Sequence, residues 1–86
     1  MIMARHRLIL IEREIDIVTR IVYNKETLLS VGLVYNLTKE RIRQINRNAL
    51  FLIYNNRDEL LKFPDNVRES ISNEISIKFK HMMRGY

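Results

Sequence analysis

The chain has 86 residues, no cysteine, two glycines and one proline, and its formal net charge at pH 7 is +5. This length suits one small domain, 1-86, near the lower size at which a hydrophobic core is stable without disulfides or a structural metal. The absence of cysteine excludes disulfides and thiolate metal sites and fits a reduced, intracellular compartment. Abundant Ile, Leu, Glu, Arg and Lys favour an all-α fold. The basic charge favours an anionic partner, most often nucleic acid, with a merely soluble basic surface as the alternative.

The first predicted helix is an entry helix over residues 7-23. Apolar residues recur there at spacings of three and four, which makes a continuous stripe: Leu8, Ile11, Ile15, Val18 and Val22. A second stripe beside it contains Leu10, Ile17 and Ile21. A helix with two apolar stripes must be covered on two sides. Either both sides are buried inside a helical bundle, or one side packs on the core and the other on a partner. The apolar run before Glu12 is too short for a signal peptide or a membrane span.

The next segment, 25-55, is predicted to be two helices joined by a short turn. Asn24 is expected to cap a helix from Lys25 to about Tyr35. Gly32 costs about 1 kcal/mol relative to Ala inside a helix, so it is either tolerated or lets another helix approach closely. Thr38 is expected to cap a helix that continues to about Asn55. This outline is that of a helix-turn-helix.

The helix that follows Thr38 has two different faces at about 100° per residue. Its apolar side contains Ile42, Ile45, Ala49 and Leu52. Its opposite side carries long polar side chains, namely Lys39, Glu40, Arg43, Gln44 and Arg47. Between Thr38 and Arg57, five basic residues stand against Glu40, so most of the net charge lies on this element and its end.

Residues 58-84 are predicted to form a C-terminal helical extension. A short helical piece should end before Pro64, and Asp65 or Asn66 can cap a last helix. Helical spacing is met by Val67, Ile71, Ile75, Phe79 and Met82. Part of this stretch also alternates as a strand would, but a lone strand would have nothing to pair with, so a helix is expected.

The sequence TLLSVGLVYNLTKERIRQINRNALFLI, residues 27–53, resembles region 4 of bacterial primary sigma factors. That region has a first helix beginning T-L-x-x-[IV]-G, then a turn, T-R-E-R-I-R-Q-I and a continuation ending in A-L. Positions that fall on this pattern without a gap are Thr27, Leu28, Val31, Gly32, Thr38, Glu40, Arg41, Ile42, Arg43, Gln44, Ile45, Ala49 and Leu50. Residues 11–15 also resemble the family's entry helix, P-x-R-E-R-E-V.

The resemblance implies that the recognition helix enters the major groove of a −35 promoter element and that the domain packs on the β flap of RNA polymerase. The expected DNA-binding residues are Thr38, Lys39, Glu40, Arg41, Arg43, Gln44 and Arg47. Gln44 suits an adenine edge, Lys39 suits guanine and Glu40 can accept from cytosine. Lys39 stands where the family usually has Arg, so its contact is less rigid. A solvated charged face is the alternative reading of these residues.

Two departures from the family are informative. The family continues A-L-R-K-L-R where this chain has apolar residues, so Leu50, Phe51 and Tyr54 are predicted to form a protein-interaction surface, covered either by the tail or by a partner. The chain also lacks a region that melts the −10 element. If residues 1-86 are the whole protein, it would act with a polymerase or another factor, as phage-encoded proteins and split sigma factors do.

The leading hypothesis is a cytoplasmic transcription regulator that binds double-stranded promoter DNA and acts with RNA polymerase. The alternative is a region 4 mimic, or protein-interaction module, that binds RNA polymerase or a sigma factor, or forms a homodimer, with little DNA contact. An enzyme is not expected, because His6 and His81 lie at opposite ends of the chain and no catalytic set is arranged around a cleft. No cofactor, metal, membrane or small-molecule substrate is expected.

Overall fold

The computed structural model describes residues 9–84, with side chains from Ile9 to Phe79. Within that range every regular element is helical, which confirms the all-α prediction. The elements are α1 (Glu12–Val18), the π-helical turn η2 (Thr19–Tyr23), α2 (Leu28–Tyr35), α3 (Lys39–Asn55), the 3₁₀ helix η3 (Arg57–Lys62) and α4 (Asp65–Arg84). The last segment is a helix rather than a strand, as predicted.

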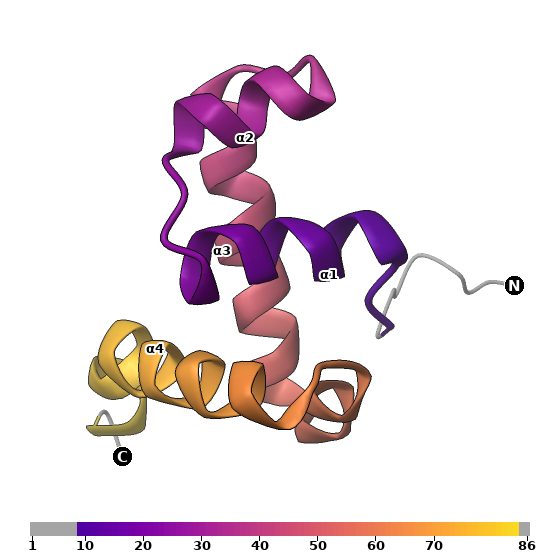
Figure 1. The fold of residues 1–86 in the computed structure, drawn as a ribbon. Coiled ribbons are helices and arrows are strands. Elements are labelled where there is room, and N and C mark those ends of the chain that lie inside the picture. Colours follow the sequence, from indigo (N-terminus) through magenta and orange to yellow (C-terminus); the bar gives the residue numbers. More distant parts are fainter. Residues whose placement is uncertain (1–8, 85–86) are drawn as a thin grey trace, which may run out of the picture.

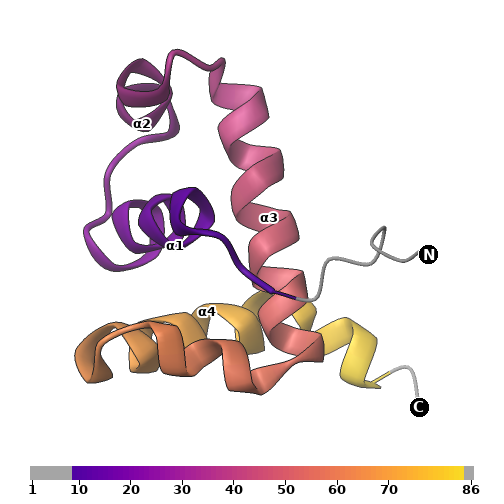
Figure 2. The same ribbon diagram turned by 90° about the vertical axis from the view of Figure 1, so that its right-hand side faces the viewer.

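The long helix α3 is the element against which the others pack. Figure 1 shows α2 at one end of α3, α1 crossing its middle and α4 crossing its other end. Figure 2 shows that α1 lies on one side of α3, while the end of α4 passes to the opposite side. Among residues 9–84, no helix lies on that opposite side along the first half of α3 (Figure 2).

The apolar side chains form two clusters. The smaller core contains Ile17, Val31, Ile42 and Ile45 and joins α1 to the two helices of the turn motif. The larger core contains Leu10, Val18, Val22, Ala49, Leu50, Ile53, Phe63, Val67, Ile71, Ile75 and Phe79. Because α1 and η2 contribute to both, the stripe residues Ile15, Ile17, Val18, Ile21 and Val22 of the entry helix are covered, fully or in part, inside the protein.

A buried asparagine lies where the two cores meet. Asn46 is 7% exposed, one turn after Ile42 and one turn before Leu50 on α3. Among the described residues its Oδ1 atom has no hydrogen-bond partner. An unpaired buried amide costs about 1–3 kcal/mol, so Asn46 lowers the stability of the fold at the boundary between the cores.

The first helix begins later than the sequence suggested. The prediction of helix from residue 7 is wrong for residues 9–11, and Leu8 lies outside the described residues. The Leu10 backbone N–H donates to Glu59 Oε1 at 2.9 Å, and Lys62 Nζ donates to the Leu10 carbonyl at 3.2 Å. These bonds join residues about fifty positions apart, so no local pattern predicts them. Ile11 consequently has an extended backbone and is 44% exposed, so it does not belong to a buried stripe.

The Glu59 carboxylate that holds this segment is itself buried and paired. Burial alone would raise its pKa, but the hydrogen bond from the Leu10 N–H and the ion pair with Lys62, at 2.7 Å, together lower the pKa below the ordinary value. A carboxylate that is stabilised in this way favours the folded state at neutral pH. It fastens the N-terminal segment to η3.

The second helix also begins later than predicted. Asn24 ends η2, because its backbone N–H donates to the Thr19 carbonyl at 3.0 Å, and Lys25 has φ +62°. A left-handed residue cannot open a helix, so the prediction that Asn24 caps a helix from Lys25 is wrong. The actual cap is Thr27, whose side chain accepts from the Ser30 N–H at 3.0 Å.

Candidate nucleic-acid interface

The turn between α2 and α3 is tight and depends on two residues. Asn36 adopts φ +58°, a left-handed conformation that asparagine tolerates better than most residues. The Gly32 carbonyl accepts from the backbone N–H of Leu37 at 2.9 Å, and a Cβ built on Gly32 would lie 2.5 Å from the Leu37 carbonyl oxygen. The absence of a side chain at Gly32 therefore admits the backbone of the turn itself, rather than another helix as the sequence had suggested.

The third helix starts where it was predicted and is capped by Thr38. The Thr38 side chain accepts from the Arg41 backbone N–H at 3.1 Å, and Glu40 lies in the first turn, where a negative charge complements the helix dipole. The Thr38 hydroxyl therefore has a structural task at the start of α3. The helix ends at Asn55, also as predicted.

The predicted DNA-binding residues share one property, which is that all of them are exposed. They are Thr38, Lys39, Glu40, Arg41, Arg43, Gln44 and Arg47. They occupy the cap and the first turns of α3, on the sides that are not packed on the cores. In the part of the chain that the structure describes, no other helix covers this side of α3 at its start (Figure 2).

Two members of this exposed face pair with each other. Arg43 donates from Nε to Glu40 Oε1 at 3.0 Å and from Nη2 to Oε2 at 2.5 Å. The hydrogen bonds from Arg43 lower the pKa of Glu40, and the same bonds raise the pKa of Arg43. Both side chains are more than half exposed, so the pair contributes little to stability and can open for another acceptor at small cost.

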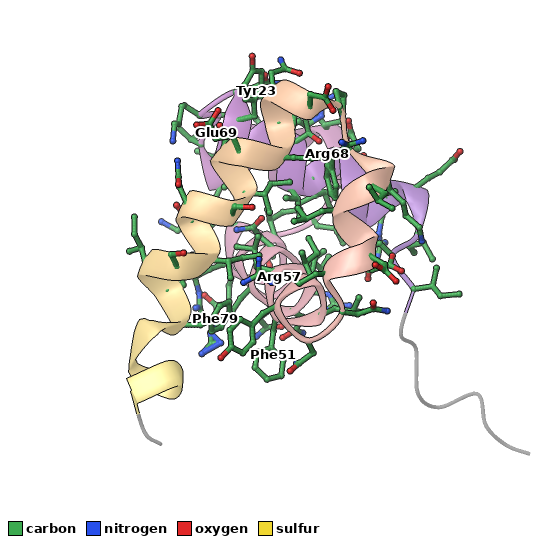
Figure 3. The ribbon with its side chains drawn as sticks, turned by 90° about the horizontal axis from the view of Figure 1, so that it is seen from below. Tyr23, Phe51, Arg57, Arg68, Glu69 and Phe79 are labelled. Atoms are coloured by element: carbon green, nitrogen blue, oxygen red, sulfur yellow. The ribbon has the colours of Figure 1, made fainter. Side chains whose placement is uncertain are left out.

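The predicted protein-interaction surface is mostly covered by the chain itself. Leu50 is fully buried in the larger core, so its assignment to a partner surface is corrected. Phe51 and Tyr54 pack on Phe79 of α4, with ring centroids 5.5 and 5.2 Å away. Figure 3 shows Phe51 and Phe79 close together where α4 passes α3. Of the two covers considered, the tail is the one observed, although Phe51 remains 38% exposed.

A second apolar surface, on α2, was not predicted from the sequence. On α2, Leu29, Leu33 and Val34 are 60%, 77% and 56% exposed. The signal was present in the sequence, since LLSVGLVY contains no charged residue, and an outward helix face is normally charged or polar. Large exposed apolar side chains that adjoin one another usually mark a contact site.

The outer side of α1 carries an open groove with a polar network at one edge. The groove is lined by Glu12, Arg13, Ile15, Asp16, Thr19, Tyr35 and Pro64. The Tyr35 hydroxyl donates to Asp16, which also accepts from Arg20 Nε at 2.8 Å. The hydrogen bond from Tyr35, followed by that from Arg20, lowers the pKa of Asp16 against the opposing effect of burial. This network ties α2 to α1 and so fixes how the turn motif sits on the entry helix.

The described residues contain no group of three or more His, Cys, Asp or Glu side chains that could hold a metal ion. The two histidines, His6 and His81, lie outside the described side chains. In the part of the chain that the structure describes, no helix has the length and apolar character needed to cross a membrane.

The short turn, the capped third helix and its exposed polar face define a helix-turn-helix domain of the DNA-binding kind. Comparison with protein families gives the same class: the family model described as Sigma-70, region 4 matches residues 4–51, more than half of the chain. The chain therefore belongs to the sigma-70 region 4 family, which confirms the resemblance, and this family is one of DNA-binding, RNA polymerase-interacting, non-enzymatic domains. No curated protein and no solved structure matches the chain.

Proposed function

We propose that this protein is a transcription regulator that binds a −35-like promoter element through α3 and acts with RNA polymerase in the bacterial cytoplasm. The observation that carries the proposal is the exposed polar face at the start of α3, presented by a helix-turn-helix of the region 4 family. A helix of this kind contacts base edges with its N-terminal residues.

The side chains of this exposed face suit different parts of the DNA. Lys39 and Gln44 present donors and acceptors that suit guanine and adenine edges in the major groove. Arg43 suits guanine or a phosphate, and Glu40 suits cytosine once their mutual ion pair opens. An exposed pair of this kind is worth only about 0–1 kcal/mol, whereas a good bidentate contact to a base discriminates by about 1–3 kcal/mol. The ion pair is therefore weak enough not to prevent Arg43 and Glu40 from turning to DNA.

The test is direct DNA binding by the purified protein. Duplexes would be selected from a random-sequence pool, and affinity for the selected duplex would be measured by fluorescence anisotropy over a range of salt concentrations. Arg43→Ala and Gln44→Ala should each weaken specific binding by roughly 5- to 100-fold. The matched control for Arg43→Ala is Arg13→Ala, which removes one exposed arginine from the groove on α1 and changes the net charge equally.

Selection of no sequence, or equal losses from Arg13→Ala and Arg43→Ala, would contradict the promoter-binding proposal. In the second case the protein would bind DNA through net charge alone.

A second candidate function is a region 4 mimic that binds RNA polymerase or a sigma factor, or a second copy of itself, with little DNA contact. The uncharged outer face of α2 favours it, since Leu29, Leu33 and Val34 are exposed together. This function predicts a complex with purified RNA polymerase or sigma factor that survives high salt and is lost in Leu33→Glu. Sedimentation of the protein alone tests self-association. A polymerase complex that is unaffected by Leu33→Glu would count against a role for α2.

A further inference from the structure

The C-terminal helix reaches the same side of α3 that carries the exposed polar face. Phe79 of α4 packs on Phe51 and Tyr54 of α3, and it is only 2% exposed. Its backbone departs from helical values, with φ −115° and ψ 16°, so α4 bends at the residue where it passes α3. Figures 2 and 3 show α4 crossing α3 at this point. The family match ends at residue 51, so α4 and its Phe79 lie beyond the matched region.

At this crossing an arginine of α3 lies over the ring of Phe79. The guanidinium carbon of Arg47 is 5.9 Å from the centroid of that ring. A cation within about 6 Å of an aromatic face is attracted by the ring quadrupole. The ring is itself fixed, because Phe51 and Tyr54 pack on it and the larger core surrounds it. The mobile member of the contact is therefore the arginine.

The position of Arg47 along α3 suits a contact with the phosphate backbone of bound DNA. It lies eight residues after Lys39 on α3, which at 1.5 Å per residue is about 12 Å along the helix axis. The major groove of B-DNA is about 12 Å wide. If the start of α3 reads base edges, Arg47 lies near the edge of the groove, where the sugar-phosphate backbone runs. An arginine suits this task because its planar fork can bond two phosphate oxygens.

We propose that Phe79 is a positioning residue for DNA binding, whose ring holds the Arg47 guanidinium ready to contact the phosphate backbone of the bound duplex. This inference rests on the proposed DNA-binding function and gives the C-terminal extension a part in it. Arg47 loses side-chain freedom when the protein folds rather than when DNA binds. Ordering a long side chain on binding lowers affinity by roughly 2- to 10-fold, so this is the gain expected from the ring.

The experiment compares ring electronics at constant shape. A ring-fluorinated phenylalanine at position 79 keeps the packing of the ring but weakens its quadrupole, whereas Phe79→Leu removes the ring and can also disturb the core. The matched control is the same fluorinated residue at position 63, because Phe63 is as buried as Phe79 and belongs to the same larger core. Each variant is made with Arg47 and with Arg47→Met. Affinity is measured on a short mixed-sequence duplex, because a phosphate contact needs no particular sequence.

Fluorination at position 79 should weaken DNA binding by roughly 2- to 10-fold when Arg47 is present. It should have no effect in Arg47→Met, and fluorination at position 63 should have no effect in either background. Nuclear relaxation of the Arg47 Nε–Hε group, measured without DNA, should show greater mobility after fluorination at position 79.

An equal loss in Arg47→Met, or an equal loss from position 63, would mean that Phe79 acts only through stability and would overturn the inference. Unchanged affinity and unchanged Arg47 mobility would overturn it as well. If the unmodified protein binds no duplex at low salt, it is the DNA-binding function that fails, and the inference fails with it. If the unmodified protein binds DNA but fluorination of Phe79 has no effect, the inference fails and the DNA-binding function stands.

Discussion

Replacement of the glycine in the turn motif sets two opposing effects against each other. Gly32→Ala places a methyl group on a helical residue, and helix propensity alone would stabilise the protein by about 1 kcal/mol. The new Cβ would, however, lie 2.5 Å from the Leu37 carbonyl oxygen, which belongs to the backbone and cannot rotate away. To relieve the contact, the turn must move.

The steric effect should win. Overpacking costs about 1–3 kcal/mol, and a shift of the turn also weakens the 2.9 Å hydrogen bond from the Leu37 N–H to the Gly32 carbonyl, worth about 1 kcal/mol. After the propensity gain is subtracted, we expect Gly32→Ala to lower the free energy of unfolding by about 1–3 kcal/mol. In a domain of this size each kcal/mol corresponds to about 4–8 °C in Tm.

Urea and thermal unfolding, followed by circular dichroism, measure this loss. Leu33→Ala is the control, because this neighbouring side chain is 77% exposed and its removal should change stability by no more than about 0.5 kcal/mol. An unfolding midpoint for Gly32→Ala equal to or above that of the unmodified protein, with the same m-value, would refute the reasoning. It would mean that the turn yields without cost.

Three further predictions concern polar groups that are buried or half-buried. Because the folded-state pKa of Glu59 is lowered, its stabilisation is present above the unfolded-state pKa of about 4.3 and is lost as the pH falls through the folded-state value. Glu59→Gln should therefore lower stability at pH 7 by about 1–3 kcal/mol and flatten the acid limb of urea unfolding; an unchanged acid limb would assign that limb to other carboxylates. Tyr35→Phe should raise the pKa of Asp16, measured by NMR titration of its carboxyl carbon, since the tyrosine hydrogen bond is the largest cause of its lowering; a pKa that does not rise would contradict this. Asn46→Leu should raise the unfolding free energy by about 1 kcal/mol by removing an unpaired buried oxygen; a destabilised variant would show that the amide has a partner or that leucine does not fit.

Much of the turn motif could be predicted because its signals are local. A threonine cap, a glutamate in the first turn and apolar residues three and four apart all act within one or two helical turns, so the sequence predicted α3 from residue 39 to 55 correctly. The side of α3 that stays exposed also followed from the periodicity, because the apolar stripe has to be buried. The roles of the exposed residues in DNA binding remain predictions.

The errors arise where a distant segment supplies the partner. The start of α1 is set by Glu59 and Lys62, which bond the backbone of Leu10 across the fold. The start of α2 was misplaced for a different reason: Asn24 is the C-cap of η2, so a residue that can cap either end of a helix was assigned to the wrong end. Periodicity also could not show that Leu50 turns inward while Phe51 stays half covered, because both depend on where α4 crosses.

By itself, then, the sequence determined the helical class, the turn motif and the family, since each rests on the type and spacing of neighbouring residues. Only the tertiary structure decided what covers the second half of α3. Phe79 lies 28 residues from Phe51 and comes to it through two intervening turns and a bend in α4, whose directions depend on the packing of the whole larger core. The ring that reaches Arg47 is thus placed by the fold, not by any motif in the chain.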